Sequence, residues 1–263
     1  MLKNPRASIL ISSYNKGNYI EQCIKSCLSQ TYKNVEIVLL DNCSNDKTNE
    51  ILKKFSNKVK ILKKNRISKY PALNQIDLLV KAFNVSKGSI IYLLDADDFF
   101  NKDKIKKINS IFKTKNKVGV IFDIPTIKNK NILKKMVIKN KKIKNIWPTI
   151  LPTSSIAMRR SFFKRFLASD NFRKFNLLEI DFRINVLAFN ILKNFLVVNK
   201  NLTYYRVTKN SIMDNTRKYS KKWWFKRKQA HEYMFKLLKK NKIRYKNIDF
   251  SVTNIFNYFL KVI

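Results

Sequence analysis

The sequence predicts an α/β protein with a mostly parallel central sheet flanked by helices, followed by a basic helical C-terminal segment. Short, continuously apolar runs are typical of strands that are buried on both faces. These runs alternate with segments that carry apolar residues at helical spacing, and such alternation favours βαβ units. The length of 263 residues and the hydrophobic content of 45% are enough for one core of this kind.

The N-terminal part of the chain contains four predicted strands separated by three predicted helices. The strands are ASILISSYN (7–15), VEIVLLDN (35–42), VKILKK (59–64) and SIIYLLD (89–95), and the helices cover 19–30, 47–55 and 72–85. Ligands of parallel sheets bind at the carboxyl ends of the strands. Asp41 closes the second strand and Asp95 the fourth, with Asp97 and Asp98 just beyond. These acids are therefore expected at a ligand crevice.

The second half of the chain continues the pattern less regularly. We expect a helix after Asn101, a strand at 117–124, a lysine-rich connection to about residue 144, and a strand that enters a helix over 151–163. An amphipathic helix over 179–191 and two short strands joined by a turn over 195–207 follow. Beyond residue 216 the composition becomes basic and aromatic.

Charge and cysteine content restrict the class of protein. The formal net charge of +39 attracts polyanions, such as nucleic acid, anionic lipid or phosphorylated substrates, but does not choose among them. The three cysteines lack CxxC spacing, so neither a disulfide framework nor a zinc site is indicated. No signal peptide and no run of roughly 18 apolar residues is recognisable. We expect a cytoplasmic protein, soluble or peripheral on the inner face of the membrane.

The string LLDADD at 93–98 concentrates negative charge in a chain with only 17 acidic residues. Two carboxylates about 4 Å apart repel by roughly 4 kcal/mol at an effective dielectric near 20, which a divalent cation would offset. Oxygen ligands suit Mn²⁺ or Mg²⁺ completed by substrate phosphates. The alternative is that Asp97 or Asp98 caps the next helix or turn. With three glycines and no glycine-rich phosphate loop, a metal–diphosphate site is predicted.

Three blocks of the sequence resemble glycosyltransferase family 2. They are SILISSYNKGNYIEQCIKSCLSQTY, VEIVLLDNCSNDKT and GSIIYLLDADDF, between residues 8 and 99. The resemblance implies a Rossmann-like GT-A fold over 1–216, with a nucleotide-binding half (1–100), an acceptor half (101–216) and a C-terminal segment at 217–263. It also implies metal-dependent, inverting transfer of a sugar from a nucleotide diphosphosugar, most often a UDP-sugar. The acceptor would be a glycan or lipid-linked sugar in surface polysaccharide biosynthesis.

The resemblance assigns roles to single residues. Asp97 would bind the Mn²⁺ or Mg²⁺ ion as part of a DxD motif. The donor would be bound by Ser12, Tyr14, Asp41, Asp95 and Ala96. Arg66 and Asn74 are further candidates for donor binding, and the alternative for Arg66 is that of a bystander in a very basic chain. Asp41 would read the base, since a carboxylate can accept from a base N–H, and Tyr14 could stack on it. Tyr14 could instead pack on the first predicted helix. Ser44 and Asp46 are expected to have a structural role, as caps of the second predicted helix.

The resemblance places a catalytic base Asp at the start of a helix in the second half, and Asp181 fits that position best. A general base takes the proton of the acceptor hydroxyl. Glu179 and Asp170 are the other candidates, and either acid at 179 or 181 could instead complement the helix dipole. Related sequences often carry a YRxHxxN-like segment whose His completes the metal shell. Here YYRVTKNS places Thr208 at that position.

The C-terminal segment carries Trp224, Ala230, Met234, Leu237 and Leu238 near one helical stripe. The stripe would either lie on an anionic membrane or pack on the core. Two rival classes remain. A haloacid-dehalogenase-like phosphatase also uses DxD, but normally after the first strand. A nucleic-acid-binding protein would use the positive charge but would not explain clustered aspartates, so no nucleic-acid partner is expected.

Overall fold

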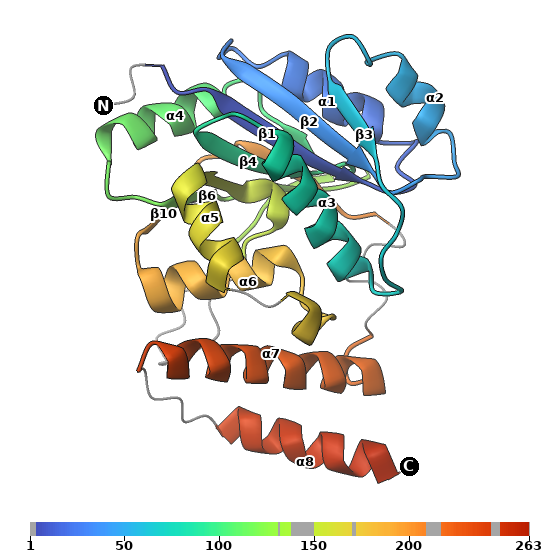
Figure 1. Cartoon of the computed structure of the whole chain (residues 1–263), viewed down its shortest axis with the longest axis vertical. Coiled ribbons are helices and arrows are strands. Elements are labelled where there is room, and N and C mark those ends of the chain that lie inside the picture. Colours follow the sequence, from blue (N-terminus) through green and yellow to red (C-terminus); the bar gives the residue numbers. More distant parts are fainter. Residues whose placement is uncertain are drawn as a thin grey trace.

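The computed structural model describes residues 4–130, 132–137, 150–169, 172–208, 217–242 and 248–262. Its centre is a seven-stranded sheet with the order β10-β6-β9-β4-β1-β2-β3 (Figure 1). The elements of its N-terminal half agree with the predicted ones to within a few residues. They are β1 (Ala7–Ser13), α1 (Ile20–Leu28), β2 (Val35–Asp41), α2 (Thr48–Lys53), β3 (Lys60–Lys63), α3 (Pro71–Val85) and β4 (Ile90–Asp95).

Strand register brings the predicted site residues to one edge of the sheet. β1 runs parallel to both β2 and β4. Ser13 of β1 is paired with Asp41, and Ser12 is paired with Asp95. The three strands therefore end together, as the apolar runs predicted, and Ser12, Ser13 and Asp95 line the crevice at this edge.

The second half adds antiparallel pairing to the sheet. Its elements are α4 (Lys104–Thr114), β6 (Val120–Asp123), the 3₁₀ turn η1 (Thr153–Ser155), β9 (Ile156–Arg159), α5 (Arg160–Ser169), the 3₁₀ turn η2 (Phe172–Phe175), α6 (Ile180–Val186), its π-helical continuation η3 (Leu187–Leu192) and β10 (Phe195–Val198). β9 lies antiparallel between β4 and β6. The fold class is the predicted one, an α/β fold with a mostly parallel central sheet.

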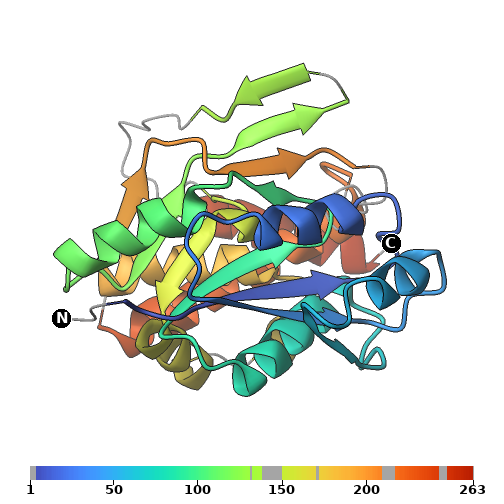
Figure 2. The same ribbon diagram turned by 90° about the horizontal axis from the view of Figure 1, so that it is seen from above.

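A second, four-stranded sheet has the order β5-β11-β7-β8. It consists of β5 (Phe99–Phe100), β7 (Thr126–Asn129), β8 (Ile132–Lys135) and β11 (Thr203–Arg206), and Figure 2 shows it along one side of the molecule. The two strands predicted over 195–207 exist but do not pair with each other: β10 joins β6, and β11 joins β5 and β7. The lysine-rich connection thus begins with two strands, while residues 138–149 lie outside the described part.

Apolar side chains on opposite faces of the central sheet form two separate cores. Along β1, Leu10 belongs to one core, whereas Ile9 and Ile11 belong to the other, because successive side chains of a strand alternate in direction. Helices α1 and α4 cover the second core, and α3, α5 and α6 cover the first. Burial on both faces explains the continuous apolar strand runs.

Helix α7 (Lys221–Lys240) packs on the core that α3, α5 and α6 cover, and α8 (Ile248–Val262) lies beyond it (Figure 1). The apolar stripe predicted in this segment is mostly buried, including Met234 and Leu237. For that stripe the core alternative is correct, and the membrane alternative is wrong. Whether residue 216 ends a domain stays a prediction. Among the described helices, none is both long and apolar enough to cross a membrane.

One buried ion pair ties the second half to the crevice. The Nζ atom of Lys104 lies 2.8 Å from Oδ1 of Asp123, and both side chains are inaccessible to solvent. The same ammonium group donates to the carbonyl of Ser154 and to Oγ1 of Thr203, at 2.6 Å each. Buried charges are tolerated only when they are paired and hydrogen-bonded. Lys104 therefore fixes η1 and β11, which both border the site described next.

Candidate active site

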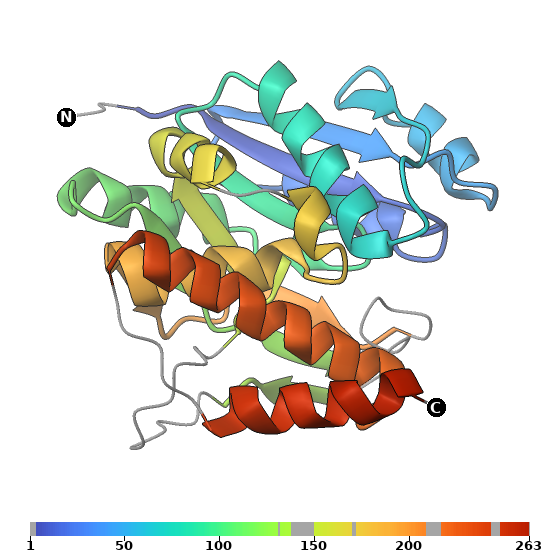
Figure 3. The same cartoon turned by 60° about the horizontal axis from the view of Figure 1, so that its bottom comes forward.

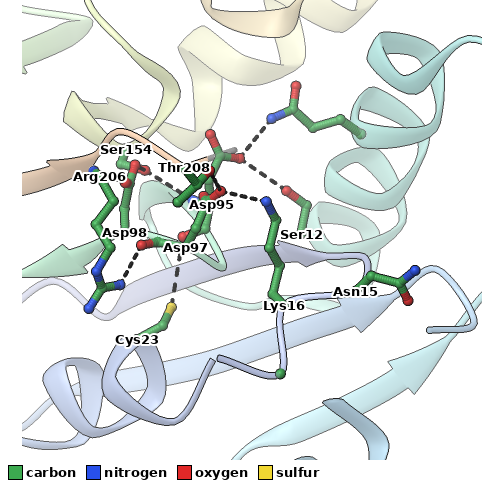
Figure 4. Close-up of polar contacts among 12 residues, drawn as sticks. Ser12, Asn15, Lys16, Cys23, Asp95, Asp97, Asp98, Ser154, Arg206 and Thr208 are labelled. Carbon is green, nitrogen blue, oxygen red and sulfur yellow. Dashed lines mark hydrogen bonds and ion pairs between the residues drawn. The ribbon is translucent and has the colours of Figure 1, made fainter. Parts of the chain in front are cut away.

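The three aspartates after β4 point in different directions, each with its own partners (Figure 4). Oδ1 of Asp95 accepts from Nε2 of Gln75 at 2.7 Å and from Oγ of Ser12 at 3.3 Å. Asp97 is directed toward Lys16: its Oδ2 lies 2.6 Å from Nζ of that lysine. The acid string is thus not a single cluster of adjacent carboxylates.

Asp98 performs a structural role in the interior. Its carboxylate accepts from Oγ of Ser154 at 2.6 Å and from the backbone N–H of Arg206 at 2.8 Å. Burial raises the pKa of Asp98 well above its ordinary value, and burial followed by the charge of Asp97 raises the pKa of Asp95 to about 6. The capping alternative is wrong for Asp98, because its carboxylate bonds Ser154 of η1 and Arg206 of β11 and not the helix or turn that follows it.

A cavity of about 370 Å³ opens at the carboxyl edge of the central sheet. Most predicted site residues line it: Ser12, Tyr14, Arg66, Asn74, Asp95, Ala96, Asp97 and Asp181. Asp41 does not line it. Both carboxylate oxygens of that buried residue accept from Ser44, from its N–H at 2.8 Å and its hydroxyl at 2.6 Å, and the neighbouring Asn42 faces the cavity. The base-reading role of Asp41 stays a prediction.

Tyr14 and Arg66 form one wall of the cavity. Nη1 of Arg66 donates to the Tyr14 hydroxyl at 3.3 Å, and the guanidinium lies 4.8 Å from the ring centroid. Asn74 holds the Arg66 loop, since its Oδ1 accepts from the N–H groups of Ile67 and Ser68 at 3.1 Å each. Tyr14 is 38% exposed and faces the cavity, which favours a ligand-binding position over packing on α1.

Asp46 joins the loop after β1 to the loop after β2. It accepts from the N–H of Thr48, the first residue of α2, at 3.0 Å and from the N–H of Gly17 at 2.9 Å. A Cβ atom at Gly17 would come within 2.4 Å of the Lys47 side chain, so the close approach of the two loops requires glycine. The structural role expected for Asp46 is the one observed.

The opposite wall carries Glu179 and Asp181 at the start of α6. Oδ1 of Asp181 accepts from the N–H of Phe182 at 2.7 Å, and Glu179 forms an ion pair with Lys226 of α7. Burial, followed by the charge of Glu179, raises the pKa of Asp181 to about 7. A carboxylate with this pKa suits a base at neutral pH. Its hydrogen bond to the N–H of Phe182 is equally consistent with the alternative in which Asp181 complements the dipole of α6. Asp170 lies outside the described residues.

The sequence did not predict Lys16, Gln75, Ser154 or Arg206 as partners of the three aspartates. Lys16 is one of 56 basic residues, and nothing local distinguishes it from the others. Gln75 follows the predicted Asn74 on α3, where the helical pattern alone does not show which polar side chain faces the strand ends. Only the fold brings these residues to the acids.

Asp97 and Thr208 offer oxygen ligands of the kind that a divalent cation prefers. Within the described part of the chain, no three His, Cys, Asp or Glu side chains are grouped as a metal site. Asp97 offers a carboxylate, and the Thr208 hydroxyl lies 3.1 Å from its Oδ2. Mg²⁺ and Mn²⁺ commonly bind one or two protein carboxylates and complete their shell with water and phosphate oxygens. An ion at Oδ2 would have to displace Lys16.

Fold and site together define the GT-A class of α/β proteins. The structure of S. aureus TarS with UDP superimposes with a TM-score of 0.58 and 15% identity, over 87% of this chain and 65% of that one. The mannosyltransferase PcManGT from Pyrobaculum calidifontis, in complex with GDP-Man and Mn²⁺, gives a TM-score of 0.57 and 15% identity, over 98% and 70%. The family model described as Glycosyl transferase family 2 matches residues 8–174. The chain belongs to this family.

Curated relatives carry glycosyltransferase names. The uncharacterized glycosyltransferase alr2836 of Nostoc sp. is 25% identical over 77% of this chain and 65% of its own length. An Escherichia coli protein, UDP-Glc:alpha-D-GlcNAc-diphosphoundecaprenol beta-1,3-glucosyltransferase WfaP, is 38% identical over 37% of this chain and 38% of its own length. The chain thus spans less than two thirds of the length of these relatives.

Proposed function

We propose that this protein is a metal-dependent, inverting glycosyltransferase that uses a nucleotide diphosphosugar. The expected donor is a UDP-sugar. The acceptor would be a glycan or lipid-linked sugar of a surface polysaccharide, reached from the cytoplasmic side of the membrane. One observation carries this proposal: Asp97 and Asp181 line the same cavity, on the strand-end side and the α6 side respectively. With these two roles, that arrangement would bring a cation site and a base to one reacting centre.

Relatives support the choice of donor and acceptor. TarS has been crystallised with UDP and with UDP-GlcNAc, and the name of the E. coli relative describes a UDP-Glc donor and a diphosphoundecaprenol-linked acceptor. PcManGT holds GDP-Man with Mn²⁺. Family membership favours this function over the phosphatase alternative.

The side chains of the cavity suggest a division of work. Tyr14 and Arg66 would bind the nucleotide, by stacking and by charge. A divalent cation at Asp97 would supply positive charge that neutralises the departing diphosphate. Asp181 would take the proton from the acceptor hydroxyl as its oxygen attacks the anomeric carbon. Attack from the side opposite the diphosphate breaks the sugar–oxygen bond and inverts the configuration.

A thermal-shift panel of UDP-sugars and GDP-mannose, each with and without Mn²⁺, tests the function. We expect one nucleotide sugar with Mn²⁺ to stabilise the protein by about 2.7 kcal/mol at a ligand concentration of about 100 Kd, which is a shift of several degrees. The same thermal-shift assay with single-stranded nucleic acid at moderate salt tests the nucleic-acid-binding alternative. Stabilisation by nucleic acid, with none by any nucleotide sugar, would favour the binding-protein alternative instead.

The transfer rate should depend on the protonation of Asp181. Because its pKa is raised to about 7, a base at this position is mostly protonated and inactive below that pH. We expect kcat/KM to rise as the pH increases through about 7 and then to level off. In Glu179→Gln the rise should move to lower pH, because the charge of Glu179 is one cause of the raised pKa. Rates that fall with increasing pH over this range would contradict the assignment.

A further inference from the structure

Helix α8 buries polar side chains against the protein and leaves a row of large apolar side chains exposed. Thr253 is fully buried and Asn257 is 6% exposed. On the other side, Ile248, Ile255 and Phe259 are 84%, 55% and 60% exposed. This is the reverse of the usual arrangement, in which a surface helix buries its apolar stripe.

Five of the exposed apolar residues form one stripe, here called the α8 face: Ile248, Val252, Ile255, Phe256 and Phe259. Their spacing of three or four residues places them on the same side of a helix. No charged residue interrupts the stripe, since the acidic Asp249 is bonded to Arg227 of α7. The α8 face is therefore an apolar strip along a helix of fifteen residues.

Specific contacts hold α8 in this orientation. Nδ2 of Asn257 donates to the carbonyl of Trp224 at 3.0 Å, and the Trp224 ring stacks on Phe256 with centroids 4.3 Å apart. Near the start of the helix, Oδ2 of Asp249 lies 3.1 Å from Nε2 of His231. The polar side chains Asp249 and Asn257 thus contact α7, while the α8 face stays exposed.

The helix beside α8 exposes many basic residues. Helix α7 lies alongside α8 (Figure 3), and its exposed positions are largely lysines: Lys221, Lys222, Lys236, Lys239 and Lys240. Glu232, an acid of the outer side of α7, is paired with Lys228. An apolar strip beside a basic surface is the combination that binds anionic lipid headgroups and inserts a short distance into the acyl region.

We infer that the α8 face docks the protein on an anionic bilayer, with α8 lying in the plane of the interface. A second copy of the chain is less suited to bind the α8 face. Each copy has a formal net charge of +39, so dimerisation through this face would bring the same lysines together. This contact differs from the one predicted from sequence, which used the stripe of α7.

Vesicle sedimentation tests the docking surface without any donor or acceptor, so it is independent of the proposed function. We expect the protein to sediment with vesicles of phosphatidylcholine and phosphatidylglycerol, and much less with phosphatidylcholine alone. The double variant Ile255→Ser/Phe259→Ser should bind anionic vesicles at least about ten-fold more weakly, since two exposed apolar side chains leave the interface. Its unfolding temperature should stay close to that of the wild type.

The matched control is Ile132→Ser/Leu133→Ser, which removes two equally exposed apolar residues from β8 and should leave binding unchanged. Equal binding of the α8 variant and the wild type would overturn the inference, because charge alone would then suffice. Absence of sedimentation would overturn it as well. A concentration-dependent dimer that the α8 variant abolishes would assign the face to a second copy.

Discussion

Asp97→Asn is expected to lower kcat/KM for sugar transfer about 10³-fold, equivalent to about 4 kcal/mol of transition-state stabilisation. The amide keeps the shape of the side chain but loses the charge that would hold a divalent cation against the diphosphate. The stabilisation that Mn²⁺ adds to nucleotide-sugar binding should disappear in the same variant. Initial rates over a Mn²⁺ titration and thermal shifts with donor measure both effects.

Asp77→Asn is the matched control for the metal-site variant. Asp77 is a carboxylate outside the cavity that pairs with Lys64, so its neutralisation changes the net charge equally without touching the site. Transfer by Asp77→Asn should remain within a few-fold of the wild type. If Asp97→Asn kept full activity and its Mn²⁺ dependence, the ion would have to bind elsewhere.

Asp181→Asn is expected to reduce kcat by about 10² to 10⁴-fold, the usual contribution of a general base. Donor affinity should hardly change, because Asp181 acts on the acceptor hydroxyl. The pH dependence near 7 should vanish from the residual rate. Steady-state rates across pH, together with donor binding by thermal shift, separate loss of the base from loss of binding.

Glu179→Gln distinguishes the two acids at the start of α6. Glu179 pairs with Lys226, and the glutamine can keep a hydrogen bond to that lysine. We expect this variant to retain most of its transfer rate. If Glu179→Gln abolished transfer while Asp181→Asn did not, Glu179 would be the base.

Much of the first hundred residues could be predicted because the signals there are local. Buried parallel strands leave continuous apolar runs, and the acids that end them follow at once in the sequence. The register of β1 with β2 and β4 then required no further information to bring these ends together.

The remainder depends on contacts that are distant in sequence. β10 and β11 look like a hairpin, but partners from other segments separate them into two sheets. Lys16 reaches Asp97 across 81 residues, and Arg206 reaches Asp98 across 108. The outward direction of the α8 face follows from contacts with Trp224 and His231, which a helical pattern does not contain.

The buried Lys104–Asp123 pair has a consequence for genetics. Lys104 lines no part of the cavity, yet it holds Ser154, which in turn bonds Asp98 and the N–H of Asp95. A random-mutagenesis screen for loss of the proposed transferase activity would therefore recover substitutions at this interior lysine alongside those of the cavity. Such alleles would mark the support of the acid loop and should not be mistaken for evidence of a lysine that touches sugar.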